Sequence, residues 1–187
     1  ALGWAYARGK GKNRKNFSRP AEIFAACAGA AIYRKSVFDM IGYFDENHFA
    51  YLEDIDIGYR AKISGFHNYF EPDAVVYHAG SAVSGSRYNE FKVKLSSKNS
   101  IYLIYKNMPV LQICLNSLFL LAGILIKLVF FVKKGLGRTY LQGIGEGIGL
   151  CFSQEGRRRK VPFRTECLGN YVRIQIELWM NIARRLK

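Results

Sequence analysis

Residues 51–60, with the sequence YLEDIDIGYR, determine the fold of the first half of this chain. Apolar positions recur every three or four residues from residue 53 to residue 64, which predicts a helix that Gly65 ends. Asp56 and Arg60 stand four residues apart and are expected to pair on this helix. The face that the helix turns inward is predicted to consist of Ile55, Tyr59, Lys62 and Ile63.

Three carboxylates, Glu53, Asp54 and Asp56, gather at the predicted start of this helix. The positive end of the helix dipole favours their ionised form, which a general base must have before it accepts a proton. The alternative interpretation is the ordinary acidic charge of a helix start.

Shorter elements are predicted on both sides of this helix. A buried strand is expected at residues 27–33, and a short helix is expected from Ser36 to Gly42. The β-branched and aromatic run at residues 74–78 predicts a second strand, which ends at His78. An imidazole in that place suits metal ligation, with a structural role as the alternative. A mobile loop is expected at residues 79–87 and a helix at residues 88–107.

The formal net charge of +14, from 28 basic and 14 acidic residues, indicates an anionic partner. Residues 8–20 are predicted to form an exposed basic loop, which is either a linker or an anion-binding segment. A nucleic-acid-binding module is an alternative, but no motif of that class is present, and we expect no nucleic-acid partner. The four cysteines form no CxxC pair, which favours free thiols in a reducing compartment.

Residues 111–132 form an apolar segment of the length that crosses a bilayer. A single crossing would place the basic residues that follow on the outer side, against the positive-inside tendency. An interfacial or re-entrant helix is therefore favoured, with a spanning helix and a buried helix as alternatives. Residues 168–187 are predicted to form a basic amphipathic helix, and an anionic membrane surface is the expected partner.

The order and spacing of several short motifs resemble the second half of a family 2 glycosyltransferase domain, with the rhamnosyltransferase-like enzymes as the nearest subgroup. The resemblance implies an α/β chain with a partial GT-A fold at residues 1–107, followed by an α-helical membrane-associated region at residues 108–187. The motifs are Cys27-Ala-Gly29-Ala30, residues 41–46 (IGYFDE), residues 51–60, residues 76–78 (VYH), Lys98-Asn99 and residues 106–109 (KNMP).

The same resemblance implies roles for individual residues. Asp54 corresponds to the catalytic base that deprotonates the acceptor hydroxyl, and Glu53 and Asp56 orient the acceptor or hold Asp54. The acceptor side of the cleft is lined by Gly29 and Ala30. The remaining two expected contacts are His78 with a Mg²⁺ or Mn²⁺ cofactor, and Arg87 with the diphosphate.

The expected activity is transfer of a sugar, with inversion, from a nucleotide sugar to a glycan or lipid-diphosphate-linked acceptor in cell-surface polysaccharide biosynthesis. The expected location is the cytoplasmic face of a bacterial or archaeal cell membrane. The donor half of such a domain is expected before Ala1, so the segment alone is expected to be inactive and to bind a nucleotide sugar poorly. The alternative is a membrane-bound remnant or scaffold without activity. A polysaccharide synthase is less favoured, because no Q-x-x-R-W motif follows the carboxylates.

Overall fold

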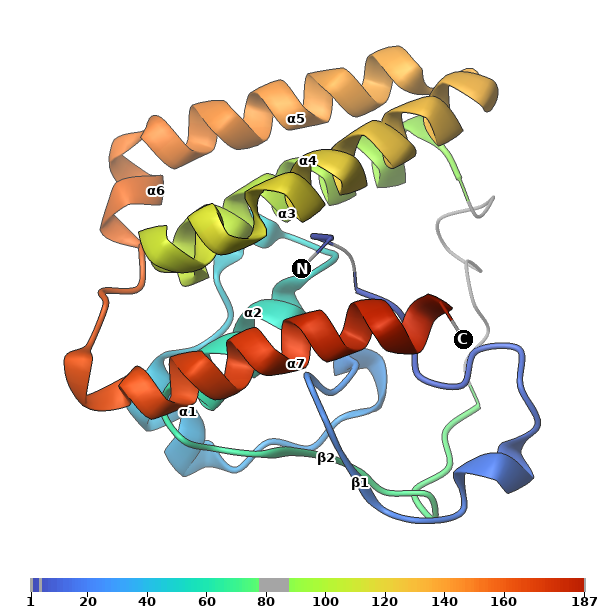
Figure 1. Ribbon diagram of the computed structural model, residues 1–187, viewed down its shortest axis with the longest axis vertical. Helices are drawn as coiled ribbons and strands as arrows, with labels where there is room; N and C mark the ends of the chain where they lie inside the picture. Colours follow the sequence, from blue (N-terminus) through green and yellow to red (C-terminus); the bar gives the residue numbers. More distant parts are fainter. Residues whose placement is uncertain (1, 4, 78–87, 187) are drawn as a thin grey trace.

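The computed structural model describes residues 2–3, 5–77 and 88–186. Within them the chain is mainly helical, with one small antiparallel sheet at one end (Figure 1). Single 3-10 turns at Arg14–Phe17, Ala28–Ala30, Glu46–His48 and Thr165–Cys167 connect the larger elements. Those elements are α1 (Lys35–Ile41), α2 (Glu53–Ile63), α3 (Glu90–Asn107), α4 (Val110–Lys133), α5 (Gly137–Phe152), α6 (Gln154–Arg158), α7 (Leu168–Leu186), β1 (Ala21–Ile23) and β2 (Asn68–Phe70).

The predicted helices are confirmed, and the predicted strands are wrong. The strand expected at residues 27–33 is a 3-10 turn with irregular chain on either side, because Asp54 accepts the backbone N–H of Ala28 and holds a turn there. Residues 74–77 are irregular and exposed, and His78 lies outside the described residues. The sheet forms instead between β1 and β2, with Glu22 opposite Tyr69.

The first hydrophobic core lies between α2 and α7. Tyr59 and Ile63 of α2 pack against Tyr171 and Ile174 of α7, and Ile63 is 0% exposed. Asn170 reaches the same helix through a hydrogen bond from its Nδ2 to the Ile63 carbonyl oxygen. Residues on both sides of the predicted domain boundary at residue 107 therefore belong to one hydrophobic core.

The second core lies between α3, α4 and α5, where Val93, Phe131 and Tyr140 meet. Helix α5 approaches α3 closely because its glycines carry no side chain on that side. A Cβ atom on Gly143 would lie 2.3 Å from the Lys94 carbonyl oxygen, and one on Gly147 would lie 2.6 Å from the Lys98 carbonyl oxygen. The Gly-rich stretch that follows the apolar segment is thus a packed helix.

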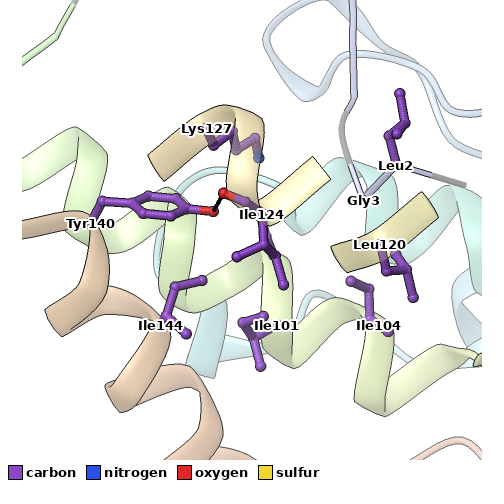
Figure 2. A pocket seen from close by; sticks show the side chains of 10 residues that line it. Leu2, Gly3, Ile101, Ile104, Leu120, Ile124, Lys127, Tyr140 and Ile144 are labelled. Carbon is purple, nitrogen blue, oxygen red and sulfur yellow. Dashed lines mark hydrogen bonds between the residues drawn. The ribbon is translucent and has the colours of Figure 1, made fainter. Parts of the chain in front are cut away.

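Helix α4 is, among the described residues, the one helix long and apolar enough to cross a membrane by length and composition. Its inner side covers α3, and Leu2 and Gly3 of the N-terminal segment approach it at Leu120 (Figure 2). The small apolar pocket there is closed on another side by Tyr140, whose hydroxyl donates to the Ile124 carbonyl oxygen at 3.4 Å. These contacts make α4 part of the folded body along its inner side.

Candidate functional site

The candidate site begins in the loop that leads into α2. Three residues without the freedom of glycine have positive φ values there: Phe49 (58°), Tyr51 (68°) and Leu52 (67°). Each such residue costs about 1–3 kcal/mol and persists only where its surroundings hold it in place. Leu52 is also the N-cap of α2, so this loop sets the direction in which Glu53 and Asp54 emerge.

Helix α3 supplies the support for this loop. The Asn99 side chain is fully buried, and its Nδ2 lies 2.7 Å from the His48 carbonyl oxygen and 2.8 Å from those of Ala50 and Tyr51. Lys98 donates from its Nζ to the Asn47 carbonyl oxygen at 2.9 Å. One helical turn of α3 thus fixes the strained loop from its inner side.

Asp54 lies in the first turn of α2 and is half-buried. Its Oδ1 accepts the backbone N–H of Ile55 at 2.8 Å, and its Oδ2 accepts that of Ala28 at 3.3 Å. The second bond joins α2 to the Ala28–Ala30 turn, which contains the predicted Gly29 and Ala30. Both are exposed, and a Cβ atom on Gly29 would meet nothing within 4 Å. Three of the expected site residues are therefore neighbours at an open surface.

Glu53 differs from Asp54 in its surroundings. Its Oε2 is buried and has no hydrogen-bond partner in the part of the chain that the structure describes. Burial and then the nearby charge of Asp54 raise the pKa of Glu53, although a backbone hydrogen bond opposes the shift. Of this adjacent pair, Glu53 is the carboxyl group that burial drives toward its neutral form.

Tyr33 lies beside the same pair, and no sequence pattern singles it out. Burial, followed by the charge of Asp54, raises the pKa of Tyr33 to about 12, so its hydroxyl is protonated at neutral pH. The hydroxyl donates to the Ala26 carbonyl oxygen at 3.4 Å. A neutral phenol thus borders the Glu53–Asp54 pair next to the Ala28–Ala30 turn.

Asp56 points into the protein interior and is 0% exposed. Lys106 donates to its Oδ2 at 2.9 Å, Arg60 donates to the same oxygen at 2.8 Å, and Asn107 donates to its Oδ1 at 2.8 Å. Burial on its own would raise the pKa of Asp56, but the charges of Lys106 and Arg60 hold it below its usual value. In this position Asp56 contacts the scaffold beneath the site.

Arg60 and Lys106 connect this buried charge to the rest of the molecule. Arg60 also donates to the backbone carbonyl groups at the end of α1, including that of Gly42 at 2.9 Å. Lys106 also donates at 2.8 Å to Asp45, which accepts a further hydrogen bond from the Tyr102 hydroxyl at 2.8 Å. The expected pairing of Asp56 and Arg60 is confirmed, as part of a larger network.

The sequence motifs Lys98-Asn99 and residues 106–109 include Asn99 and Lys106 of α3, but no role was predicted for these residues. Asn99, Tyr102 and Lys106 recur at intervals of three and four residues, which places them on one face of a helix. That spacing was the available signal. It predicts a common inward face, but it does not identify which carbonyl oxygens that face will meet.

The remaining expected residues, His78 and Arg87, lie outside the described residues. Within residues 2–3, 5–77 and 88–186, no three His, Cys, Asp or Glu side chains are grouped so that they would hold a metal ion. The one expected metal contact, His78, lies outside the described residues, so the Mg²⁺ or Mn²⁺ site stays a prediction.

Comparison with known proteins gives one short similarity. The chain is 40% identical over 47 residues to the N-acetylglucosaminyl-diphospho-decaprenol L-rhamnosyltransferases of two Mycobacterium tuberculosis strains, CDC 1551 / Oshkosh and ATCC 25618 / H37Rv. The matched segment covers 25% of this chain and only 15% of each relative's length. No family model and no solved structure matches. A quarter of the chain is therefore related to a glycosyltransferase.

Proposed function

We propose that this chain takes part in transferring a sugar from a nucleotide sugar to a glycan or lipid-diphosphate-linked acceptor, with inversion. The observation that carries the proposal is Asp54, which a strained loop and a bond to the Ala28–Ala30 turn hold next to the exposed Gly29 and Ala30. The short similarity to a rhamnosyltransferase supports the same class of reaction. In this proposal residues 1–107 form the acceptor side of a GT-A fold.

Asp54 acts as the general base in the proposed reaction. It accepts the proton of the acceptor hydroxyl while the hydroxyl oxygen forms a bond to the anomeric carbon of the donor. The bond from that carbon to the diphosphate oxygen breaks, and its electron pair leaves with the nucleoside diphosphate. Each Asp54 oxygen already accepts one backbone N–H, and each keeps a further lone pair for the acceptor.

The neighbouring residues position the acceptor and the base. Gly29 follows Ala28, which bonds Asp54, and has open space where a side chain would stand, which suits a sugar ring that must approach the backbone closely. Glu53 and the neutral Tyr33 hydroxyl supply polar contacts beside it. Asp56 supports the start of α2 from below through Lys106. The proposal retains His78 as a contact to Mg²⁺ or Mn²⁺ and Arg87 as a contact to the diphosphate.

Sugar transfer by membranes that carry the full-length protein tests this proposal. A panel of nucleotide sugars, with Mg²⁺ or Mn²⁺ and a lipid-diphosphate-linked acceptor, is compared for wild type, Asp54→Asn and Glu53→Gln. Removal of a general base is expected to lower the rate at least about a hundredfold. Asp73→Asn is the matched control, because it makes the same change at an exposed carboxylate that belongs to neither α2 nor the turn.

The outcomes of this assay distinguish Asp54 from Glu53 as the base, and an enzyme from a scaffold without activity. Loss of transfer in Asp54→Asn, with protein level unchanged, supports Asp54 as the base. A larger loss in Glu53→Gln than in Asp54→Asn transfers that role to Glu53. Absence of transfer with every donor by wild type, at normal protein level, favours a scaffold without activity and overturns the proposal.

A further inference from the structure

Helix α4 buries polar side chains and exposes apolar ones, which is the reverse of an ordinary surface helix. Leu111 is 70% exposed and Leu118 is 79% exposed, whereas Gln112 is 5% exposed and Asn116 is 0% exposed. A helix on a water-facing surface buries its apolar side and leaves its polar side in water. The outer side of α4 is therefore suited to an apolar environment.

The buried polar side of α4 is bonded to α7, which fixes the rotation of α4. Gln112 donates to the Tyr171 carbonyl oxygen at 2.9 Å, and Asn116 and Gln175 exchange two hydrogen bonds of 2.8 and 3.1 Å. Rotating the leucines inward would break these bonds and leave buried amides without partners. The exposure of the leucines is thus enforced by the fold.

Exposed apolar residues recur along α4 from Leu111 to Val132 and along α7 from Leu168 to Trp179. Figure 1 shows α4 in front of α3 and α7 in front of α2. Trp179 joins them, because its Nε1 donates to Asn116 Oδ1 at 3.2 Å while the side chain stays 43% exposed. The exposed apolar residues of this surface, named here the α4–α7 face, are Leu111, Leu115, Leu118, Leu125, Val129 and Val132 of α4, and Leu168, Val172, Ile176 and Trp179 of α7.

We propose that the α4–α7 face docks on the surface of an anionic lipid bilayer, with both helices lying in the plane of the membrane. Large exposed apolar faces mark interaction sites, and the net charge of +14 favours an anionic partner. Lys133 and Lys134 are exposed where α4 ends, so they reach lipid headgroups when the leucines enter the acyl region. This inference does not depend on sugar transfer.

The neighbours of α4 favour the in-plane orientation over a crossing. Lys94 and Glu146 form an ion pair on α3 and α5, and both side chains are more than 40% exposed. Glu177 pairs with Lys62 on the other flank, along α7. A crossing by α4 would carry these flanking charges to the depth of the hydrocarbon, where they are costly. In the plane of the membrane they stay in water or among headgroups.

Depth measurement with spin labels distinguishes the two orientations. Single cysteines replace Leu111, Leu118, Leu125 and Val132 in turn, in a chain whose exposed Cys27 and Cys114 are serine. These four positions share one face, and the first and last are about 30 Å apart along the axis. On vesicles of phosphatidylcholine and phosphatidylglycerol, equal depths are expected. A steady change of depth along the series would overturn the in-plane orientation.

Vesicle flotation tests the face itself. Leu118→Glu with Leu125→Glu is expected to lower binding about tenfold or more, the effect of losing buried leucine side chains. Ile32→Glu with Met40→Glu is the matched control, because it adds the same charge at two exposed apolar residues elsewhere. Circular dichroism confirms that each variant is folded.

Three results would overturn the proposal. The first is equal vesicle binding by the leucine variant and its control. The second is wild-type binding to pure phosphatidylcholine as tight as binding to mixed vesicles at low salt. The third is a stable dimer in sedimentation that the leucine variant abolishes while vesicles fail to bind, since a second copy of the chain would then cover the face.

Discussion

Asn99 Nδ2 lies 2.8 Å from the carbonyl oxygen of Tyr51, a residue with a φ of 68°. A buried amide of α3 therefore stabilises the backbone conformation from which Glu53 and Asp54 project. The candidate site depends on α3 as much as on α2, although no α3 residue belongs to its surface.

Replacing Asn99 by alanine is expected to lower the free energy of unfolding by about 3 kcal/mol, because three backbone carbonyl groups lose their donor. Urea unfolding followed by circular dichroism measures the change. Asn16→Ala is the control, since Asn16 is exposed, and its effect is expected to stay within about 0.5 kcal/mol. Equal effects of the two substitutions would contradict the supporting role of Asn99.

Lys106→Met is expected to cost about 3–5 kcal/mol, because it leaves the buried carboxylates of Asp45 and Asp56 without their shared cation. Lys94→Met removes a cation from the same helix, but its ion pair with Glu146 is exposed, so a loss of at most about 1 kcal/mol is expected. The two variants are compared by their urea midpoints. A cost for Lys106→Met as small as that of Lys94→Met would show that the network contributes little.

His48 is expected to make the protein less stable as the pH falls below about 6.5. Burial lowers the pKa of this fully buried imidazole, while the nearby charges of Asp56, Lys106, Asp45 and Lys98 act in both directions. Its folded pKa lies below the unfolded value, so its contribution is present above about pH 6.5 and is lost as the pH falls toward the folded pKa. The unfolding free energy is measured at pH 7.5, 6.5 and 5.5.

His48→Gln is expected to flatten this pH dependence, and His67→Gln is expected to retain it, because His67 is 40% exposed. Below about pH 4 a second loss is expected in every variant. The pKa values of Asp45 and Asp56 are lowered. Burial opposes this shift at both carboxyl groups, but Lys106 and the other neighbours together outweigh it, with Arg60 among them at Asp56. A wild-type curve that is flat between pH 7.5 and 5.5 would contradict the role given to His48.

Gly143→Ala and Gly145→Ala are expected to change stability in opposite directions. A Cβ atom at residue 143 meets the Lys94 carbonyl oxygen, so α5 must move away from α3 at a cost of about 2 kcal/mol. Residue 145 has open space, and alanine there is expected to stabilise the helix by about 1 kcal/mol. Thermal unfolding of the two variants is the measurement, and a Gly143→Ala variant as stable as wild type would refute the close packing of α5 on α3.

The sequence predicted helices more reliably than the faces they bury. Apolar periodicity located α2, and the length of the apolar run located α4, but neither pattern showed that α4 would bury Gln112 and Asn116. In α7, Tyr171 is buried while its apolar neighbours Leu168 and Val172 are exposed. The choice between faces depends on partners far away in the chain, which a local pattern does not contain.

Local sequence patterns were equally insufficient to predict the candidate site. The acidic start of α2 was visible in the sequence, and the family resemblance assigned Gly29 and Ala30 to the same cleft as Asp54. The separate environments of Glu53 and Asp54 were not visible, because they depend on a residue as distant as Tyr33 and on three positive φ values that no short pattern encodes. The strand predicted at residues 27–33 failed because small residues in a row also suit a turn.

The core shared by α2 and α7 also constrains the order of folding during synthesis. Ile63 and Asn170 are joined across 107 positions, so this core cannot close until α7 has left the ribosome. The leucines of α4 emerge well before that moment. A nascent chain that meets a membrane surface at this stage can bury the α4 leucines in it. A nascent chain that meets no membrane keeps these leucines exposed, and is prone to aggregate, until α7 has been synthesised.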